Sequence, residues 1–282
     1  MTGSIEQALA QWAPQQVPSA LGRVQFRSAG HAPGVSHVLL HGIGSGSASW
    51  VRQLQAADVT PTARLLAWDA PGYESSDPVN AEWPLASDYA ARLWAWLDAM
   101  NVTGPVTLVG HSLGALVAAG AALLQPARVA RLVLLAPARG YGNVSPEEQQ
   151  HKLQDRLATL NRLGPTGMAQ ARAAAMLSPQ AAPALVAAVR NTMARVLPAG
   201  YTQAARLLVR GDLLADLARL HCPVQVASGS ADTITPPAAC DAVAAQCGVQ
   251  RLDLGPVGHA CTLEAAPAVN ALLGLSTMTS QP

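Results

Sequence analysis

Residues 106–116 read VTLVGHSLGAL and carry the clearest structural signal in the chain. An apolar run ends at the glycine-rich turn GHSLG (110–114), and a stretch of small apolar residues, 115–124, follows directly. The pattern predicts a buried strand, a sharp turn and a helix. Gly110 and Gly114 lie two residues before and two residues after Ser112. We expect that a Cβ at either position would collide with neighbouring elements.

The Gly-x-Ser-x-Gly pattern is typical of a nucleophile elbow, a turn that exposes a serine hydroxyl at the carboxyl end of a strand. The helix after Ser112 should direct its free N–H groups and positive dipole end toward the place where an oxyanion would develop. A tight glycine turn around a buried serine is the alternative. The strand before the turn and the helix after it favour the elbow, so Ser112 is a candidate nucleophile.

A serine acts as a nucleophile when a histidine, oriented by a carboxylate, takes its proton. Residues 249–254 alternate like a strand and lead into a glycine-flanked loop that carries His259. Residues 224–227 predict another strand, and Asp232 follows on the loop at its end. The order Ser112, Asp232, His259 therefore supplies a nucleophile, an acid and a base, each just past a predicted strand.

A second glycine-rich loop follows the apolar run at 38–40, where the sequence continues HGIGSG (41–46). We expect the second oxyanion donor here, so that the backbone N–H groups of Ile43 and Leu113 hold the developing negative charge. A phosphate-binding loop is the alternative, but it requires a different glycine spacing. The remaining histidines are expected to be solvated or buried, and His111 to support the turn.

Composition and charge agree with a single soluble catalytic domain. The 282 residues, 50% hydrophobic and 12% charged, can bury a full core. A net charge of +1 without a basic cluster argues against nucleic-acid binding. The longest apolar run, 113–124, is too short to span a membrane, and no secretory signal is visible, so we expect a cytoplasmic protein.

Neither a metal nor an organic cofactor is expected. Four cysteines occur without a Cys-x-x-Cys pair, which favours free thiols over a disulfide or zinc framework. They are Cys222, Cys240, Cys247 and Cys261. The expected partner is a small-molecule ester or lactone, and a homodimer is left open.

Alternating strands and helices predict an α/β architecture, a mostly parallel sheet with helices on both faces. Residues 1–22 are expected to form an extra helix or arm. The expected strands are 24–29, 36–41, 64–68, 105–110, 130–135, 223–228 and 249–254, and the expected helices are 86–100, 113–124, 236–246 and 262–274.

Residues 138–222 are far more than the dozen or so that a crossover between parallel strands needs. They predict a helical cap over Ser112, inserted in a core formed by 1–137 and 223–282. Helix starts are expected at Ser145-Pro146 and Ser178-Pro179, a break at 198–200, and a further helix at 213–220. Most arginines of the cap should face solvent, and one is a candidate to meet a substrate carboxylate: Arg139, Arg156, Arg162, Arg172, Arg190, Arg195, Arg206 and Arg210.

Five stretches, taken in order, resemble the α/β-hydrolase superfamily over residues 22–275. In proteins of this kind the turn after the early strand is structural, so the resemblance implies that Asp69 stabilises a loop and does not act as the catalytic acid. The matching stretches are HGIG (41–44), WDAPGY (68–73), GHSLG (110–114), GSAD (229–232) and GH (258–259) with Glu264 and Pro267.

Two finer resemblances suggest a reaction. The segment DTITPP (232–237), with 200–205, is similar to 3-oxoadipate enol-lactonases, which open a lactone. GIGSG (42–46) is similar to meta-cleavage product hydrolases, which break a carbon–carbon bond, but this chain has Leu263 and His111 where those enzymes carry tryptophan and asparagine. We therefore expect a serine hydrolase of carboxylic esters or lactones. A carbon–carbon bond hydrolase and a non-catalytic ligand-binding protein are the alternatives.

Overall fold

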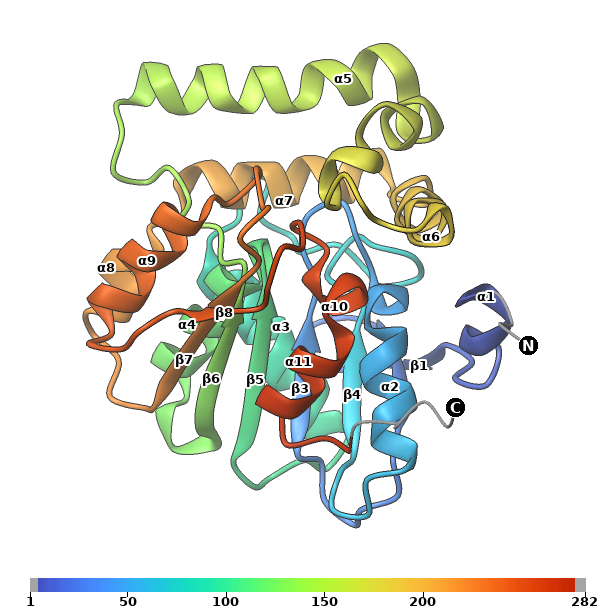
Figure 1. Cartoon of the computed structure of the whole chain (residues 1–282). Helices are drawn as coiled ribbons and strands as arrows, with labels where there is room; N and C mark the ends of the chain where they lie inside the picture. Colours follow the sequence, from blue (N-terminus) through green and yellow to red (C-terminus); the bar gives the residue numbers. More distant parts are fainter. Residues whose placement is uncertain (1–4, 277–282) are drawn as a thin grey trace.

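The computed structural model describes residues 5–276, and within them an eight-stranded mixed sheet forms the centre of the molecule (Figure 1). The strand order is β1-β2-β4-β3-β5-β6-β7-β8. β2 pairs antiparallel with both β1 and β4, and every other pair is parallel. The strands are β1 (Gln15–Val17), β2 (Val24–Ala29), β3 (His37–Leu40), β4 (Leu65–Trp68), β5 (Val106–His111), β6 (Val129–Leu135), β7 (Val224–Ser228) and β8 (Leu252–Asp253).

Helices cover both faces of this sheet, and β3 shows why. Val38 and Leu40 belong to the hydrophobic core on one face, whereas Leu39 belongs to the core on the other. Successive side chains of a strand point to opposite faces, so a strand that is apolar at every position must be covered on both sides. The predicted mostly parallel α/β architecture is confirmed.

The helices are named here in chain order. They are α1 (Ile5–Leu9), α2 (Val51–Asp58), α3 (Ala86–Ala99), α4 (Leu113–Leu124), α5 (Pro146–Arg172), α6 (Pro183–Met193), α7 (Pro198–Arg210), α8 (Leu213–Leu217), α9 (Pro237–Gln246), α10 (Cys261–Glu264) and α11 (Ala266–Leu272), with short 3-10 helices at Ser47–Trp50, Pro126–Arg128 and Ala174–Met176. None of the helices between residues 5 and 276 is long and apolar enough to cross a membrane.

The segment between β6 and β7 is helical, as expected. α5, α6 and α7 lie across the carboxyl edge of the central strands, and α5 is the outermost layer (Figure 1). The predicted start of α5 is confirmed, because the Ser145 hydroxyl accepts a hydrogen bond from the backbone N–H of Glu148 at 3.2 Å. α5 bends at Gly164, whose φ of 67° a residue with a side chain adopts only under strain. α8 packs against α4 and α9 beside the sheet.

Two details of the helical segment were predicted wrongly. Ser178-Pro179 does not begin a helix: the backbone N–H and hydroxyl of Ser178 donate to the carboxylate of Glu264, and α6 begins only at Pro183. The predicted break at 198–200 is instead the first turn of α7, where Pro198 needs no N–H partner. Gly200 packs so closely on Gly72 that a Cβ at position 200 would lie 1.9 Å from the carbonyl oxygen of Gly72.

The C-terminal elements are shorter than predicted. The strand expected at 249–254 is reduced to β8, which pairs with β7 through two residues at the edge of the sheet. The helix expected at 262–274 is divided into α10 and α11 around Ala265, because Pro267 has no N–H to continue the helical hydrogen bonds. The N-terminal segment forms α1 and β1, and α2 was not predicted.

Candidate active site

Ser112 lies between β5 and α4 in a strained conformation, with φ 53° and ψ −116°. Its N–H donates to the carbonyl of Leu135 at 3.0 Å, and its own carbonyl accepts from the N–H of Ala138 at 3.1 Å. A Cβ at Gly114 would come within 2.1 Å of the carbonyl oxygen of Leu40, and one at Gly110 within 2.5 Å of the carbonyl oxygen of Gly114. The expected strand, sharp turn and helix, with both glycines sterically required, are confirmed.

Asp232 and His259 form a buried pair although they come from different loops. The Nδ1 of His259 donates to Oδ2 of Asp232 at 2.9 Å, and the side chain of Asp232 is fully buried. The backbone N–H groups of Ile234 and Thr235 donate to Oδ1 at 2.8 and 3.0 Å. Burial alone would raise the pKa of Asp232, but the hydrogen bond and charge of His259 and the N–H of Thr235 outweigh it and lower this pKa. The carboxylate is therefore held charged.

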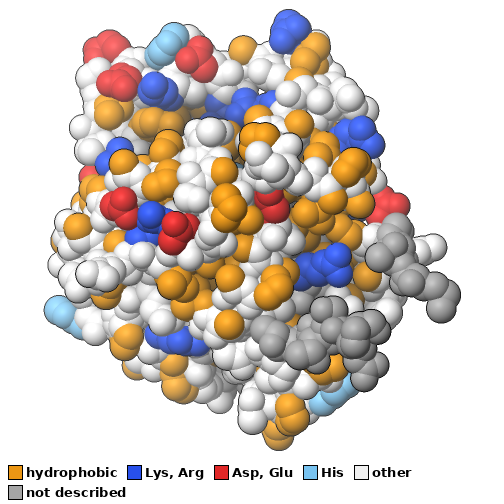
Figure 2. Space-filling view, in the orientation of Figure 1, with side chains coloured by type: hydrophobic (Ala, Val, Ile, Leu, Met, Phe, Trp, Pro, Cys, Tyr) orange, Lys and Arg blue, Asp and Glu red, His pale blue; other side chains and the backbone are white. Residues whose placement is uncertain are grey.

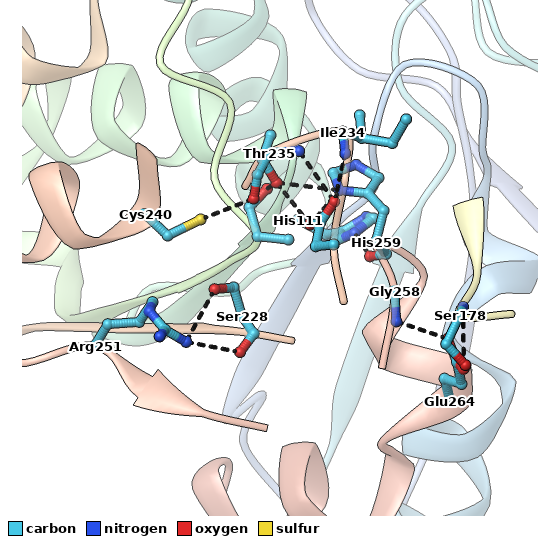
Figure 3. A network of polar contacts seen from close by, with 12 residues as sticks. His111, Ser178, Ser228, Ile234, Thr235, Cys240, Arg251, Gly258, His259 and Glu264 are labelled. Atoms are coloured by element: carbon cyan, nitrogen blue, oxygen red, sulfur yellow. Dashed lines mark hydrogen bonds and ion pairs between the residues drawn. The ribbon is translucent and has the colours of Figure 1, made fainter. Parts of the chain in front are cut away.

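Thr235 completes this pair and was missed in the sequence analysis. Its hydroxyl lies 2.8 Å from Oδ2 of Asp232, 3.2 Å from Nδ1 of His259 and 3.1 Å from the carbonyl oxygen of Ala136 (Figure 3). A hydroxyl has one proton to donate, so it donates either to the carboxylate or to the carbonyl of Ala136. The only signal in the sequence is the position of the threonine, three residues after the acid.

His111 lies directly against His259, and their ring centres are 4.8 Å apart. Nε2–H of His111 donates to the backbone carbonyl of His259 at 2.8 Å (Figure 3). Burial, followed by the neighbouring charge of His259, lowers the pKa of His111 to about 3, so this ring is neutral near pH 7. Its contacts match the supporting role expected for it.

His41 connects the two loops on the other side of Ser112. Its Nε2 accepts from the backbone N–H of Ala70 at 2.9 Å, so the proton is on Nδ1, which donates to the carbonyl of Gly42 at 2.8 Å. Tyr73 donates its hydroxyl proton to the carbonyl of Ile43. Among the described residues, no hydrogen-bond partner occupies the backbone N–H of Ile43 or of Leu113. Both groups are therefore available as donors.

Asp69 is separate from this pair. Its buried carboxylate accepts from the backbone N–H of Ser47 at 2.7 Å, the hydroxyl of Ser47 at 3.0 Å and the amide of Gln25 at 2.9 Å. These bonds connect the turn after β4 to the loop after β3. The contacts agree with the structural role that the resemblance implies for Asp69.

A cavity of about 270 Å³ opens above Ser112. Ser112, His259, Ile43 and Leu113 all line it, whereas Asp232 lies behind His259 and does not. Its walls are largely apolar, and three methionines come from the segment between β6 and β7: Met168, Met176 and Met193. The candidate nucleophile, the candidate base and two free N–H groups thus meet at one concave, mostly apolar surface, which is typical of a small-molecule site.

Glu264 connects the loop of His259 to the helical segment above it. Its carboxylate accepts from the backbone N–H of Gly258 at 2.9 Å and from the backbone N–H and hydroxyl of Ser178 (Figure 3). The backbone N–H of Ala260 also donates to the carbonyl of Met176 at 2.7 Å. The residues before and after His259 are therefore both attached to the segment that covers the cavity.

Of the four cysteines, Cys240 contacts this network: its Sγ donates to the carbonyl oxygen of Thr235 at 3.4 Å (Figure 3). All four are unpaired, as predicted, and Cys261 is buried two residues after His259. Burial raises the pKa of the Cys261 thiol far above its usual value, so it is not a reactive thiolate near pH 7. Between residues 5 and 276 no group of three or more His, Cys, Asp or Glu side chains is arranged to hold a metal ion.

Three buried histidines should make the protein less stable as the pH falls. Burial lowers the pKa of His37 and His41 to about 4 and that of His111 to about 3, from an ordinary value of 6.5. The unfolded chain therefore binds more protons between about pH 6.5 and 4. We expect the free energy of unfolding to fall across this range, by up to about 1.4 kcal/mol per histidine and pH unit.

Urea denaturation at pH 7, 6 and 5 measures this effect. The raised pKa of Asp69, caused by its burial, acts in the opposite direction at the acidic end and reduces the total. His37→Gln, which removes a histidine distant from Ser112, should show a smaller fall in stability with pH than the wild type. A free energy of unfolding that stays constant from pH 7 to pH 5 would contradict the prediction.

Comparison with known proteins agrees with this geometry. Residues 38–272 match the family model described as the alpha/beta hydrolase family. The chain is 31% identical over 261 residues to "Putative carbamate hydrolase RutD" of Klebsiella pneumoniae, covering 87% of this chain and 93% of that protein. Its fold is similar to a thermophilic esterase from Thermogutta terrifontis (TM-score 0.80, 22% identity, 93% and 97% of the two chains). It is equally similar to the enol-lactonase from Burkholderia xenovorans LB400 (TM-score 0.80, 19% identity, 92% and 98%). A family match of this extent, on this sheet and around this serine, means that the chain belongs to the α/β-hydrolase family.

Proposed function

We propose that this protein is a serine hydrolase that cleaves a carboxylic ester or lactone through an acyl-enzyme. One observation carries the proposal: the strained Ser112 and His259, which the buried Asp232 orients, line the same cavity. Backbone strain in a residue other than glycine is stabilised only where the surrounding structure imposes it, and it occurs preferentially at functional sites. A tight glycine turn around a buried serine would not require an oriented histidine beside it.

The proposed mechanism begins with His259. Because its Nδ1 donates to Asp232, its Nε2 is the nitrogen free to accept a proton. Nε2 takes the proton of Ser112 as the serine oxygen attacks the carbonyl carbon, and Asp232 stabilises the imidazolium that results. The carbonyl electrons move onto oxygen and form a tetrahedral oxyanion. The imidazolium then donates its proton to the departing alcohol or enol oxygen, which leaves an acyl group on Ser112.

The second half of the reaction uses the same groups. A water molecule gives one proton to His259 Nε2 as its oxygen attacks the acyl carbon. When the second oxyanion collapses, the bond to Ser112 Oγ breaks, His259 returns that proton to Oγ, and the carboxylic acid is released. We assign the oxyanion hole to the backbone N–H groups of Ile43 and Leu113, for which residues 5–276 supply no other acceptor. The dipole of α4, which begins at Leu113, adds positive potential there.

We propose that residues 138–222 act as the cap of this site, inserted in a core of 1–137 and 223–282. α5, the 3-10 helix Ala174–Met176 and α6 supply the methionines above the serine, and these flexible side chains suit an acyl chain. A cap in this place would exclude water from the oxyanion and select the substrate.

Carbamate hydrolysis is a second candidate reaction. The similarity to the protein named as a carbamate hydrolase extends over nearly the whole chain. A carbamate presents the same carbonyl to Ser112, with nitrogen on one side of it, so the same groups would act. Carbon–carbon bond hydrolysis remains an alternative, although His111 and Leu263 stand where meta-cleavage enzymes carry asparagine and tryptophan.

A serine-directed fluorophosphonate tests the proposal. We expect it to label Ser112 alone, which peptide mass spectrometry would localise, and to abolish hydrolysis of p-nitrophenyl esters in proportion to labelling. Ser45 lines the same cavity but does not belong to the elbow between β5 and α4, so Ser45→Ala should still be labelled. A folded protein that is not labelled and cleaves no ester, lactone, carbamate or dienone acid would instead support the non-catalytic alternative.

Glu264 offers a test of how the base is positioned. Glu264→Ala leaves the N–H of Gly258 without its acceptor and removes one of the two attachments of the His259 loop to the cap, so we expect kcat to fall about 10- to 100-fold. Ser178→Ala removes only one donor on the cap side and should retain most of the rate. Steady-state kinetics with a p-nitrophenyl ester, together with thermal unfolding of each variant, separates mispositioning from lost stability. Wild-type kcat in Glu264→Ala would exclude this positioning role.

A further inference from the structure

The cavity above Ser112 has a strong imbalance of charge. Three arginines line it: Arg139, Arg156 and Arg172. Among the described residues that line this cavity, none is Asp or Glu. Figure 2 shows basic side chains visible in the hollow beneath the helical layer at the top of the molecule. A hydrolase of neutral esters needs no positive charge beyond the oxyanion hole, so these arginines are not explained by the proposed mechanism.

The three guanidinium groups are also unpaired. Within residues 5–276 none of them has an ion pair or a side-chain hydrogen bond. Other arginines of the same segment are occupied: Arg195 pairs with Glu74 at 2.7 Å, and Arg206 donates to the carbonyl of Glu82 at 2.8 Å. Arg195 and Arg206 thus attach the helical segment to the core, whereas the three arginines that line the cavity have no such partner in the described part of the chain.

Arg156 and Arg172 stand out among the three. Both are half-buried and belong to α5, on either side of its bend at Gly164, whereas Arg139 is exposed. A guanidinium that loses part of its hydration without gaining a partner costs free energy, and an anion that enters the site removes this cost. The apolar walls around them would strengthen such an ion pair.

We propose that the substrate carries a carboxylate in addition to the bond that is cleaved, and that Arg156 and Arg172 bind it. This inference rests on the proposed hydrolase function and specifies its substrate class. The planar guanidinium fork matches the two oxygens of a carboxylate and forms charge-assisted hydrogen bonds with them. Arg139, on the loop after β6, adds positive potential that attracts the anion to the cavity.

The test compares esters that differ in one carboxylate. p-Nitrophenyl butyrate is the neutral substrate. Mono-p-nitrophenyl glutarate carries the carboxylate on the acyl group, and 3-carboxy-4-nitrophenyl butyrate carries it on the leaving group. For whichever carboxylate ester the wild type prefers, Arg156→Gln and Arg172→Gln should each lower the ratio of its kcat/KM to that of the neutral ester about 10- to 100-fold. The wild-type preference should also weaken as salt is raised.

Arg162→Gln is the matched control, because Arg162 lies on the same helix and carries the same charge but is exposed and does not line the cavity. It should leave the ratio unchanged. An equal loss in Arg162→Gln, or no change of the ratio in Arg156→Gln and Arg172→Gln, would overturn the inference. Fluorophosphonate labelling of Ser112 in every variant reports the proposed function separately. If labelling and neutral-ester hydrolysis persist while the ratio does not move, the carboxylate site alone is refuted.

Discussion

Replacing Ser112 by alanine should leave a folded protein whose kcat/KM for ester hydrolysis is lower by a factor on the order of 10³ or more. Loss of the nucleophile from a coupled triad removes the covalent pathway, and the oxyanion hole and substrate binding then provide only residual catalysis. Alanine removes only the hydroxyl and keeps the Cβ. The backbone at position 112 therefore meets the same steric constraint as in the wild type, and its strained conformation is preserved. Steady-state kinetics with p-nitrophenyl esters, with circular dichroism to verify folding, measures the effect.

Two controls make this result specific. The variant should lose fluorophosphonate labelling entirely, whereas Ser45→Ala should retain it. If a folded Ser112→Ala enzyme kept most of the wild-type rate, the nucleophile would have to be another residue.

Asp232→Asn should lower kcat by about 10³- to 10⁴-fold without unfolding the protein. The carboxylate of Asp232 accepts a hydrogen bond from Nδ1–H of His259 and so keeps Nε2 unprotonated and free to act as the base. An asparagine can present its amide N–H to the ring, which favours the opposite tautomer and leaves Nε2 protonated. The charge that stabilises the imidazolium is lost as well. A pH–rate profile should show that raising the pH does not restore the activity, because the defect is the tautomer of the neutral ring and not its state of protonation.

Asp69→Asn is the contrasting variant. Asp69 accepts three hydrogen bonds from Ser47 and Gln25 and none from His259, so its replacement should affect stability more than turnover. We expect the free energy of unfolding to fall by about 1–3 kcal/mol, while the kcat of the folded fraction remains close to that of the wild type. If Asp69→Asn were folded but inactive and Asp232→Asn turned over normally, the two roles would have to be exchanged.

The sequence alone predicted the sheet, the elbow and the order of the candidate triad. These features are local: a strand that is buried on both faces has an unbroken apolar run, and a turn with no room for a Cβ requires glycine. Ser112, Asp232 and His259 could be chosen because each follows such a strand, and parallel strands bring their carboxyl ends to one edge. Where the local signal was weak, at 249–254 and around Pro267, the predicted elements were too long.

The tertiary structure decided what surrounds these residues. Nothing in the sequence near Thr235 shows that its hydroxyl reaches both Asp232 and His259, and nothing near Glu264 shows that it binds Ser178, which is distant in the chain. The arginines of the helical segment were equivalent in the sequence, and only packing placed some of them at the cavity and others against the core. Periodicity reports which face of an element is buried, but a partner distant in the chain is set by how helices and loops cross in space, and no local pattern encodes that crossing.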